Sequence, residues 1–259
     1  MNPNLPTSTT PPALPPPIRS PLPPGEHPDD RLPITGMLAT MEAILRQPRR
    51  MLFQLRQPSA THAIAMLLVL AVICAAGYGV VVGTFSGGNQ LWIAPVKIVG
   101  GMLVAALICL PSLYIFSCLA GSQARLVEVF GLVAGLLVLT TILLIGFAPV
   151  AWVFSQSTHS VAAMGALHFS FWVIATFFGW RFLRNGFTYA NANSNIALPV
   201  WIAIFVLVCV QMVTALRPII GTSQTYFPAD RKFFLGHWSE VWEQEPASRV
   251  VPPAPTVPR

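Results

Sequence analysis

The chain has 259 residues, of which 54% are hydrophobic and only 9% are charged. The charges gather near the two ends and in short breaks between long apolar runs, and the formal net charge is +6. A soluble domain of this length needs charge over its whole surface, so the composition excludes that class. The basic residues lie beside apolar segments and form no stripe interleaved with aromatic residues, which favours a membrane over a nucleic acid as partner.

Residues 1–35 are rich in proline and polar residues and contain no apolar core of the length that a signal peptide needs. Such a segment buries too little apolar surface to offset the entropy lost on ordering. We therefore predict a disordered Pro-rich tail that favours extended polyproline conformations. A second disordered tail is predicted at 246–259.

An amphipathic segment, 36–60, follows the tail and carries apolar residues at helical spacing. Pro48 interrupts the pattern, so the segment is expected to form one or two short helices. We interpret it as a cytoplasmic segment that lies on the membrane surface and contacts anionic lipid head groups through its arginines. These are Arg46, Arg49, Arg50 and Arg56.

Five apolar runs reach the roughly 20 residues that a helix needs to cross the core of a bilayer. They are uniformly apolar and do not alternate, which favours helices over a β-barrel. The predicted fold is therefore an all-α membrane protein, a five-transmembrane-helix bundle over 61–221. The spans are expected at 63–84, 95–119, 127–154, 161–183 and 196–216.

The basic residues of the loops predict the orientation of this bundle. Arginines precede the first span and follow the second and fourth, at Arg125, Arg181 and Arg184, whereas the loops after the first and third spans contain no Lys or Arg. The positive-inside rule then places the N-terminus in the cytoplasm and, with five spans, the C-terminus outside. Residues 222–245 are expected to form an interfacial amphipathic helix with two tryptophans on its apolar face.

Short motifs along the chain resemble a known family. The sequence AILRQPRRMLF (43–53) precedes the first span, LPSLY (110–114) lies in the second, and GSQAR (121–125) leads into a third span that ends in APV (148–150). With LRPIIG (216–221) after the last span, this pattern resembles the bacterial Yip1-like five-span membrane proteins, and a set of uncharacterised bacterial proteins labelled actin-binding WH2 domain-containing.

The resemblance covers about 37–221 and implies a multi-pass protein of the bacterial inner (plasma) membrane with a trafficking-like or scaffold role. The acidic-Leu-Tyr-Gly-Pro motif of the eukaryotic relatives that bind GTPases is absent. The sequence LRQP at 45–48 is a poor match to the Leu-Lys-Lys-Thr-like turn that a WH2 segment needs.

His168 is the first candidate for function, because a titratable residue inside a span suggests a functional site by default. It lies roughly 10 Å below the outer face at 1.5 Å per residue, and Gln211 in the fifth span lies at a similar depth. The two would hydrogen-bond if the fourth and fifth spans were neighbours. Such a contact could belong to a proton relay or a ligand site, or it could be a structural hydrogen bond between two helices. We favour packing because no acidic partner lies in the core of the spans.

Glycines and prolines within the spans indicate how the helices pack. Gly131 and Gly135 form a GxxxG spacing, which lets helix backbones approach closely, within one bundle or at an oligomer seam. Pro111 and Pro149 are expected to kink the second and third spans. Broken helices can line transport sites, but we favour structural kinks here.

Signatures of enzymes and metal sites are missing from the sequence. It contains no HExxH, GxSxG or P-loop motif and no paired intramembrane Asp, and its four cysteines lack metal-ligand spacing. We therefore expect no enzyme activity, no catalytic residue, no cofactor and no metal.

The leading hypothesis is a non-catalytic membrane scaffold, assembly or trafficking-like protein. Its expected partners are membrane lipids and an unidentified membrane protein or a second copy of the chain, and no nucleic acid. The alternatives are a small-solute or ion permeation protein and, less favoured, an accessory subunit of a larger membrane complex.

Overall fold

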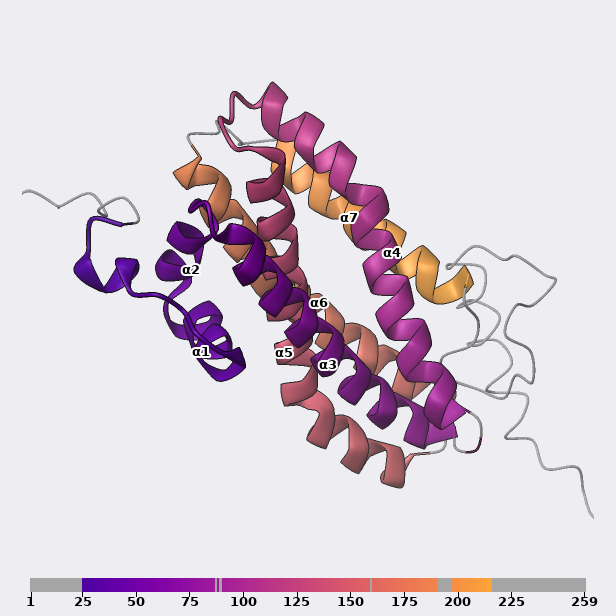
Figure 1. Ribbon diagram of the computed structural model, residues 1–259. Helices are drawn as coiled ribbons and strands as arrows, with labels where there is room; N and C mark the ends of the chain where they lie inside the picture. Colours follow the sequence, from indigo (N-terminus) through magenta and orange to yellow (C-terminus); the bar gives the residue numbers. More distant parts are fainter. Residues whose placement is uncertain (1–24, 87, 89, 159, 191–196, 216–259) are drawn as a thin grey trace, which may run out of the picture.

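The computed structural model describes residues 25–86, 88, 90–158, 160–190 and 197–215, which form helices and no strand. A short 3-10 helix, η1, is followed by seven α-helices (Figure 1). The all-α class is confirmed, while the predicted segments 222–245 and 246–259 and most of the Pro-rich tail lie outside the described residues. The elements are η1 (Pro28–Arg31), α1 (Met37–Arg46), α2 (Pro48–Gln54), α3 (Ala60–Ser86), α4 (Gln90–Leu119), α5 (Leu126–Ser157), α6 (Val161–Tyr189) and α7 (Ala197–Ala215).

Four helices, α3 to α6, are long and apolar enough to cross a membrane. They mark the chain as a multi-pass integral membrane protein. The hydrocarbon core offers no water to the backbone N–H and C=O groups, and a helix bonds these groups within its own segment. α7 is also apolar, but its part with described side chains, Leu198–Cys209, is shorter than a span. Helix α4 continues through Pro95 and Pro111, and α5 continues through Pro149, so these prolines do not end their helices.

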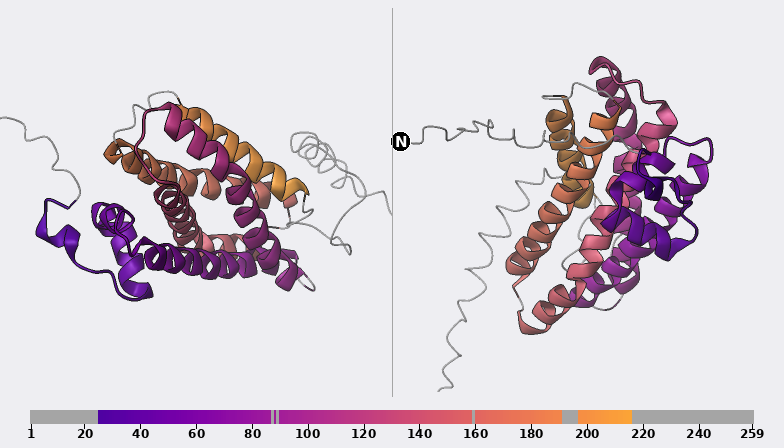
Figure 2. Two further views of the ribbon diagram at one scale, coloured as in Figure 1. Left: turned by 45° about the horizontal axis from the view of Figure 1, so that its top comes forward. Right: turned by 90° about the vertical axis from the view of Figure 1, so that its left-hand side faces the viewer.

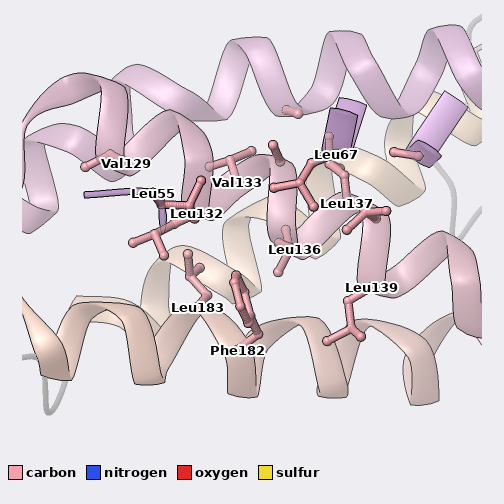
Figure 3. Packing of buried hydrophobic residues seen from close by; sticks show 14 of the residues in the cluster. Leu55, Leu67, Val129, Leu132, Val133, Leu136, Leu137, Leu139, Phe182 and Leu183 are labelled. Atoms are coloured by element: carbon pink, nitrogen blue, oxygen red, sulfur yellow. The ribbon is translucent and has the colours of Figure 1, made fainter. Parts of the chain in front are cut away.

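Helix α5 lies at the centre of the bundle. Every residue from 131 to 142 is buried. Helices α3 and α6 pack along α5, α4 packs along α3, and α7 packs along α4; Figure 2 shows the arrangement from two further sides. The side chains that fill the core around α5 include Leu132, Leu136 and Phe182 (Figure 3).

Large apolar side chains also cover the outside of the long helices. Examples are Leu107 and Ile108 on α4 and Phe177 and Phe178 on α6, each 44% exposed or more. In water such a surface would be an aggregation liability, whereas in a bilayer it faces lipid. The burial pattern therefore agrees with the membrane assignment.

Side chains of the same chain occupy the space beside the two glycines of the GxxxG spacing. Gly131 faces Leu55 and Ile64, and Gly135 faces the ring of Phe182 on α6. The structure thus uses both glycines for close packing within one bundle, the first of the two roles considered for them.

Helices α1 and α2 fold back against this bundle. The first ends at Arg46 and the second begins at Pro48, where the sequence predicts a break. Their apolar side chains, among them Ile44, Met51 and Leu52, are buried against protein. This apolar face is therefore covered by the bundle and not by lipid, although Leu38 remains 83% exposed.

Candidate functional site

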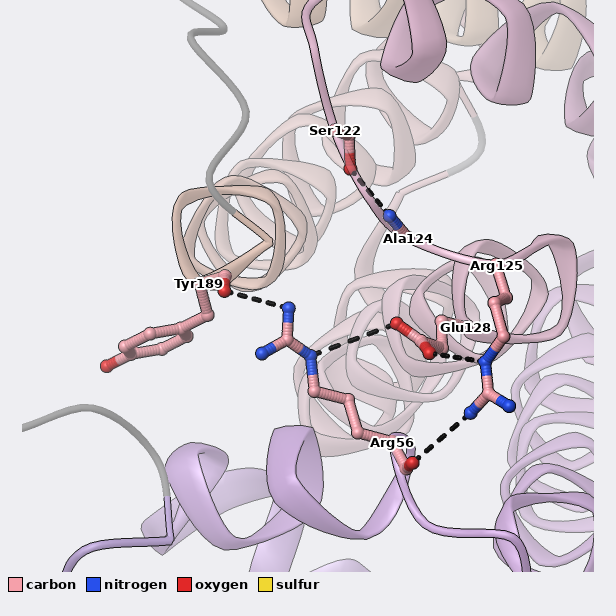
Figure 4. A network of polar contacts seen from close by, with 6 residues as sticks. All are labelled: Arg56, Ser122, Ala124, Arg125, Glu128 and Tyr189. Atoms are coloured by element: carbon pink, nitrogen blue, oxygen red, sulfur yellow. Dashed lines mark hydrogen bonds and ion pairs between the residues drawn. The ribbon is translucent and has the colours of Figure 1, made fainter.

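A charged cluster lies at the end of the bundle where α2, α5 and α6 meet (Figure 4). Nε of Arg125 donates a hydrogen bond to Oε1 of Glu128 at 2.9 Å. Nε of Arg56 lies 3.8 Å from Oε2 of the same carboxylate. The Glu128 side chain is only 14% exposed. Two guanidinium groups therefore contact one carboxylate, and that carboxylate has little access to water.

The same arginines also bond to backbone carbonyls. Nη2 of Arg56 donates to the carbonyl oxygen of Tyr189 at 2.8 Å, and Nη2 of Arg125 donates to the carbonyl oxygen of Arg56 at 3.3 Å. Tyr189 ends α6, where carbonyls lack helical partners and a cation interacts favourably with the helix dipole. Glu128 lies in the first turn of α5, where a negative charge is favoured. The cluster therefore joins the loop after α2, the start of α5 and the end of α6.

A small pocket opens beside the cluster. Its apolar lining includes Leu52, Leu55, Leu132, Gly186 and Ala190, and its polar lining is Arg56, Glu128 and Tyr189. A cavity with one apolar and one charged wall suits an amphipathic ligand better than a purely polar one.

His168 contacts Tyr78 of α3 inside the bundle. The Tyr78 hydroxyl and His168 Nδ1 are 2.5 Å apart, and the two rings meet edge-on. The expected neighbour Gln211 lies in α7, which packs along α4 and not along α6. An apolar cluster that includes Leu144 and Phe171 surrounds Tyr78.

Breaking the contact between Tyr78 and His168 is expected to cost little stability. In a membrane such a bond contributes about 0.6 kcal/mol on average, so Tyr78→Phe and His168→Leu should each lower the free energy of unfolding by about 1 kcal/mol or less. A double-mutant cycle from unfolding in detergent would measure the coupling. A coupling near zero would contradict the bond. A folded His168→Leu variant that lost solute flux would instead support the permeation hypothesis.

A second intramembrane bond, between α7 and α4, was not expected from the sequence. Nε1 of Trp201 donates to the carbonyl oxygen of Cys109 and to Oγ of Ser112, both at 3.1 Å. Trp201 is fully buried. The signal that could have revealed the site is Ser112, a hydroxyl within an apolar span, because a buried indole N–H needs an acceptor.

The arginines predicted to contact lipid have mostly protein partners. Arg50 donates to the carbonyl oxygens of Leu32 and Pro33 at 3.0 and 2.8 Å, and Arg49 lies 4.0 Å from the Asp30 carboxylate. These contacts, like those of Arg56, hold the chain's own segments together. The Arg46 side chain is 77% exposed and pairs with Glu42. Lipid contact by these arginines stays a prediction.

Among the described residues, no group of three or more His, Cys, Asp or Glu side chains could hold a metal ion. Comparison with models of protein families, with curated proteins and with solved structures gave no match. The resemblance to the Yip1-like family therefore stays a prediction that rests on the motifs alone.

Proposed function

We propose that this chain is a non-catalytic membrane scaffold or assembly protein that acts through helix packing and through binding of lipid or a membrane partner. The observation that carries the proposal is that polar side chains within the helices bond to other helices of the same chain. His168 bonds to Tyr78, and Trp201 bonds to Ser112, so both pairs tie the chain's own helices together. The outward faces carry large apolar side chains, which suit lipid or another helix.

The proposal includes five spans with a cytoplasmic N-terminus. Helix α7 has 19 residues; at 1.5 Å per residue its length is about 28 Å, close to the thickness of the hydrocarbon core. The charged cluster with Arg56 and Arg125 lies at the end of the bundle that the positive-inside rule assigns to the cytoplasm. Trp92 lies near the start of α4 and Trp152 near the end of α5, both away from the charged cluster. Their side chains are 76% and 51% exposed, as in an interfacial aromatic belt.

The permeation alternative has one observation in its favour. Nε2 of His168 is buried and has no hydrogen-bond partner among the described residues. The apolar neighbours of the pair between His168 and Tyr78 favour a structural contact, because a solute path needs successive polar groups. A bacterial inner-membrane location is part of the proposal, whereas an accessory role in a larger complex is the weaker alternative.

Extraction of the full chain from native membranes into polymer-bounded lipid discs tests the proposed function. Chemical cross-linking and quantitative mass spectrometry should recover a second copy or a stoichiometric membrane partner, and sister subunits carrying a cofactor would identify the accessory role. A lone monomer without partners would overturn the scaffold proposal. Flux of a solute panel into liposomes, lost in His168→Leu, would replace it with permeation.

A further inference from the structure

The guanidinium group of Arg56 is only partly used by the charged cluster. Its Nε faces Glu128 and its Nη2 donates to the carbonyl oxygen of Tyr189, whereas Nη1 has no hydrogen-bond partner among the residues that the structure describes. The Arg56 side chain is 40% exposed. In Figure 4 the remaining amine of Arg56 and the ring of Tyr189 lie on the same side of the cluster, away from Arg125. An arginine fixed at two nitrogens and open at the third is arranged to receive an anion.

The charge of the cluster fits a singly charged anion. Arg56 and Arg125 contribute two positive charges, and Glu128 contributes one negative charge, so the cluster carries a formal charge of +1. The shared carboxylate holds both guanidinium groups in place without neutralising them. A phosphodiester carries one negative charge and would balance the cluster.

The pocket next to Arg56 supplies the apolar half of such a site. Leu52, Leu132 and Ala190 line it, and the side chains of Leu52 and Leu132 pack closely onto Gly186, which also lines the pocket. Free phosphate would gain nothing from this wall. The glycerol and first methylene groups of a phospholipid would pack against it, and basic pockets between membrane helices are known to take anionic head groups.

We propose that the pocket between α2, α5 and α6 binds the head group of an anionic phospholipid, with the phosphodiester held by Arg56 and the Tyr189 hydroxyl. The inference deepens the proposed function, because it names the lipid class for its lipid-binding part. It also differs from a general attraction of arginines to the membrane surface, since it assigns one site with one polar and one apolar wall.

Native mass spectrometry of the purified full chain in neutral detergent tests the site with dioleoyl phosphatidylglycerol and, as the uncharged comparison, dioleoyl phosphatidylcholine. Arg56→Gln should weaken binding of phosphatidylglycerol about fivefold and leave phosphatidylcholine unchanged, the effect of one surface arginine. Tyr189→Phe should weaken it about twofold, since it removes one hydrogen bond from the phosphate. Arg184→Gln, which changes an exposed arginine of α6 outside the cluster, is the matched control and should have less effect than either.

Glu128→Gln separates a lipid site from a purely structural cluster. Glutamine keeps a side-chain oxygen that can still accept from both arginines, but it removes the negative charge between them. The variant should therefore bind phosphatidylglycerol more tightly, even if the protein unfolds at a lower temperature. Weaker binding in this variant, or equal losses for both lipids in Arg56→Gln, would overturn the proposal. Displacement by glycerol 3-phosphate at the same concentration as the lipid would show that the anion alone is recognised. Because lipid is added to isolated protein, the result does not depend on recovery of a membrane partner.

Discussion

Replacing Gly79 with alanine is expected to lower the free energy of unfolding by about 2–3 kcal/mol, at the upper end of the usual cost of overpacking. A Cβ atom at Gly79 would lie 2.5 Å from Cα of Pro95 and 2.9 Å from its nitrogen. The obstacle is the backbone of α4, and a side-chain rotation therefore cannot relieve it. The extra methyl group must push α3 and α4 apart where they cross, and the contacts on both sides of the crossing would be lost with it.

The matched control for this variant is Gly100→Ala. Gly100 lies in an apolar stretch of α4, and among the described residues no atom outside its own turns of helix would lie within 4 Å of an added Cβ atom. Alanine should be neutral or slightly stabilising at this position, because it is the better helix former. If both variants unfolded alike, the close approach of α3 and α4 at Gly79 would be wrong.

The chain provides its own probe for this unfolding measurement. Cys74, Cys109 and Cys209 are buried, whereas Cys118 is exposed. In a Cys118→Ser background, a thiol-reactive dye should label the protein only as it unfolds. The melting curve of each variant in mild detergent then reports the opening of the bundle.

The long helices could be predicted from the sequence because lipid leaves the backbone few choices. An apolar run of about 20 residues must satisfy its own amides and carbonyls, and it does so as a helix. The spans expected at 63–84, 95–119 and 127–154 all fall inside α3, α4 and α5. The break at Pro48 likewise follows from the covalent structure of proline.

The neighbours of each helix could not be predicted in the same way. Position along a span gives the depth of His168, but it does not give the direction in which the side chain points or which helix stands there. Adjacency in the chain suggested Gln211 as partner, whereas the structure pairs His168 with Tyr78, from a helix far away in the sequence. Tyrosine is also grouped with the hydrophobic residues, so the sequence pattern does not single out the hydroxyl group of Tyr78 as a hydrogen-bond partner.

The charged cluster had a clear but overlooked signal. Glu128 is the one acidic residue between positions 63 and 216 of the sequence. A single carboxylate at the end of an apolar helix needs a cation close by, since a partly buried charge without a partner is costly. Arg125 is three residues away and could have been proposed as that cation. Arg56 could not, because only the fold brings it to the same carboxylate.

Truncating Trp201 to alanine should have an effect as large as that of Gly79→Ala or larger, because this side chain attaches α7 to α4. Its indole is fully buried, stacks on Phe205 with ring centroids 5.3 Å apart, and donates to α4 beside Pro111. Loss of a buried Trp side chain typically costs about 3–5 kcal/mol. Trp201→Phe keeps a ring for the stacking but removes the N–H donor and part of the buried volume, so it should cost less than Trp201→Ala.

The position of the tryptophan, and not its size, should decide the outcome. Trp92 of α4 is 76% exposed, so Trp92→Ala removes as many atoms while leaving no cavity. It should change the melting temperature little, whereas Trp201→Ala should expose Cys109 and Cys209 to the thiol-reactive dye well below the parent melting temperature. Equal melting of the two alanine variants would mean that α7 is held by lipid contact alone. A Trp201→Phe variant as unstable as Trp201→Ala would show that the indole N–H and the second ring hold α7, and that the stacking on Phe205 contributes little.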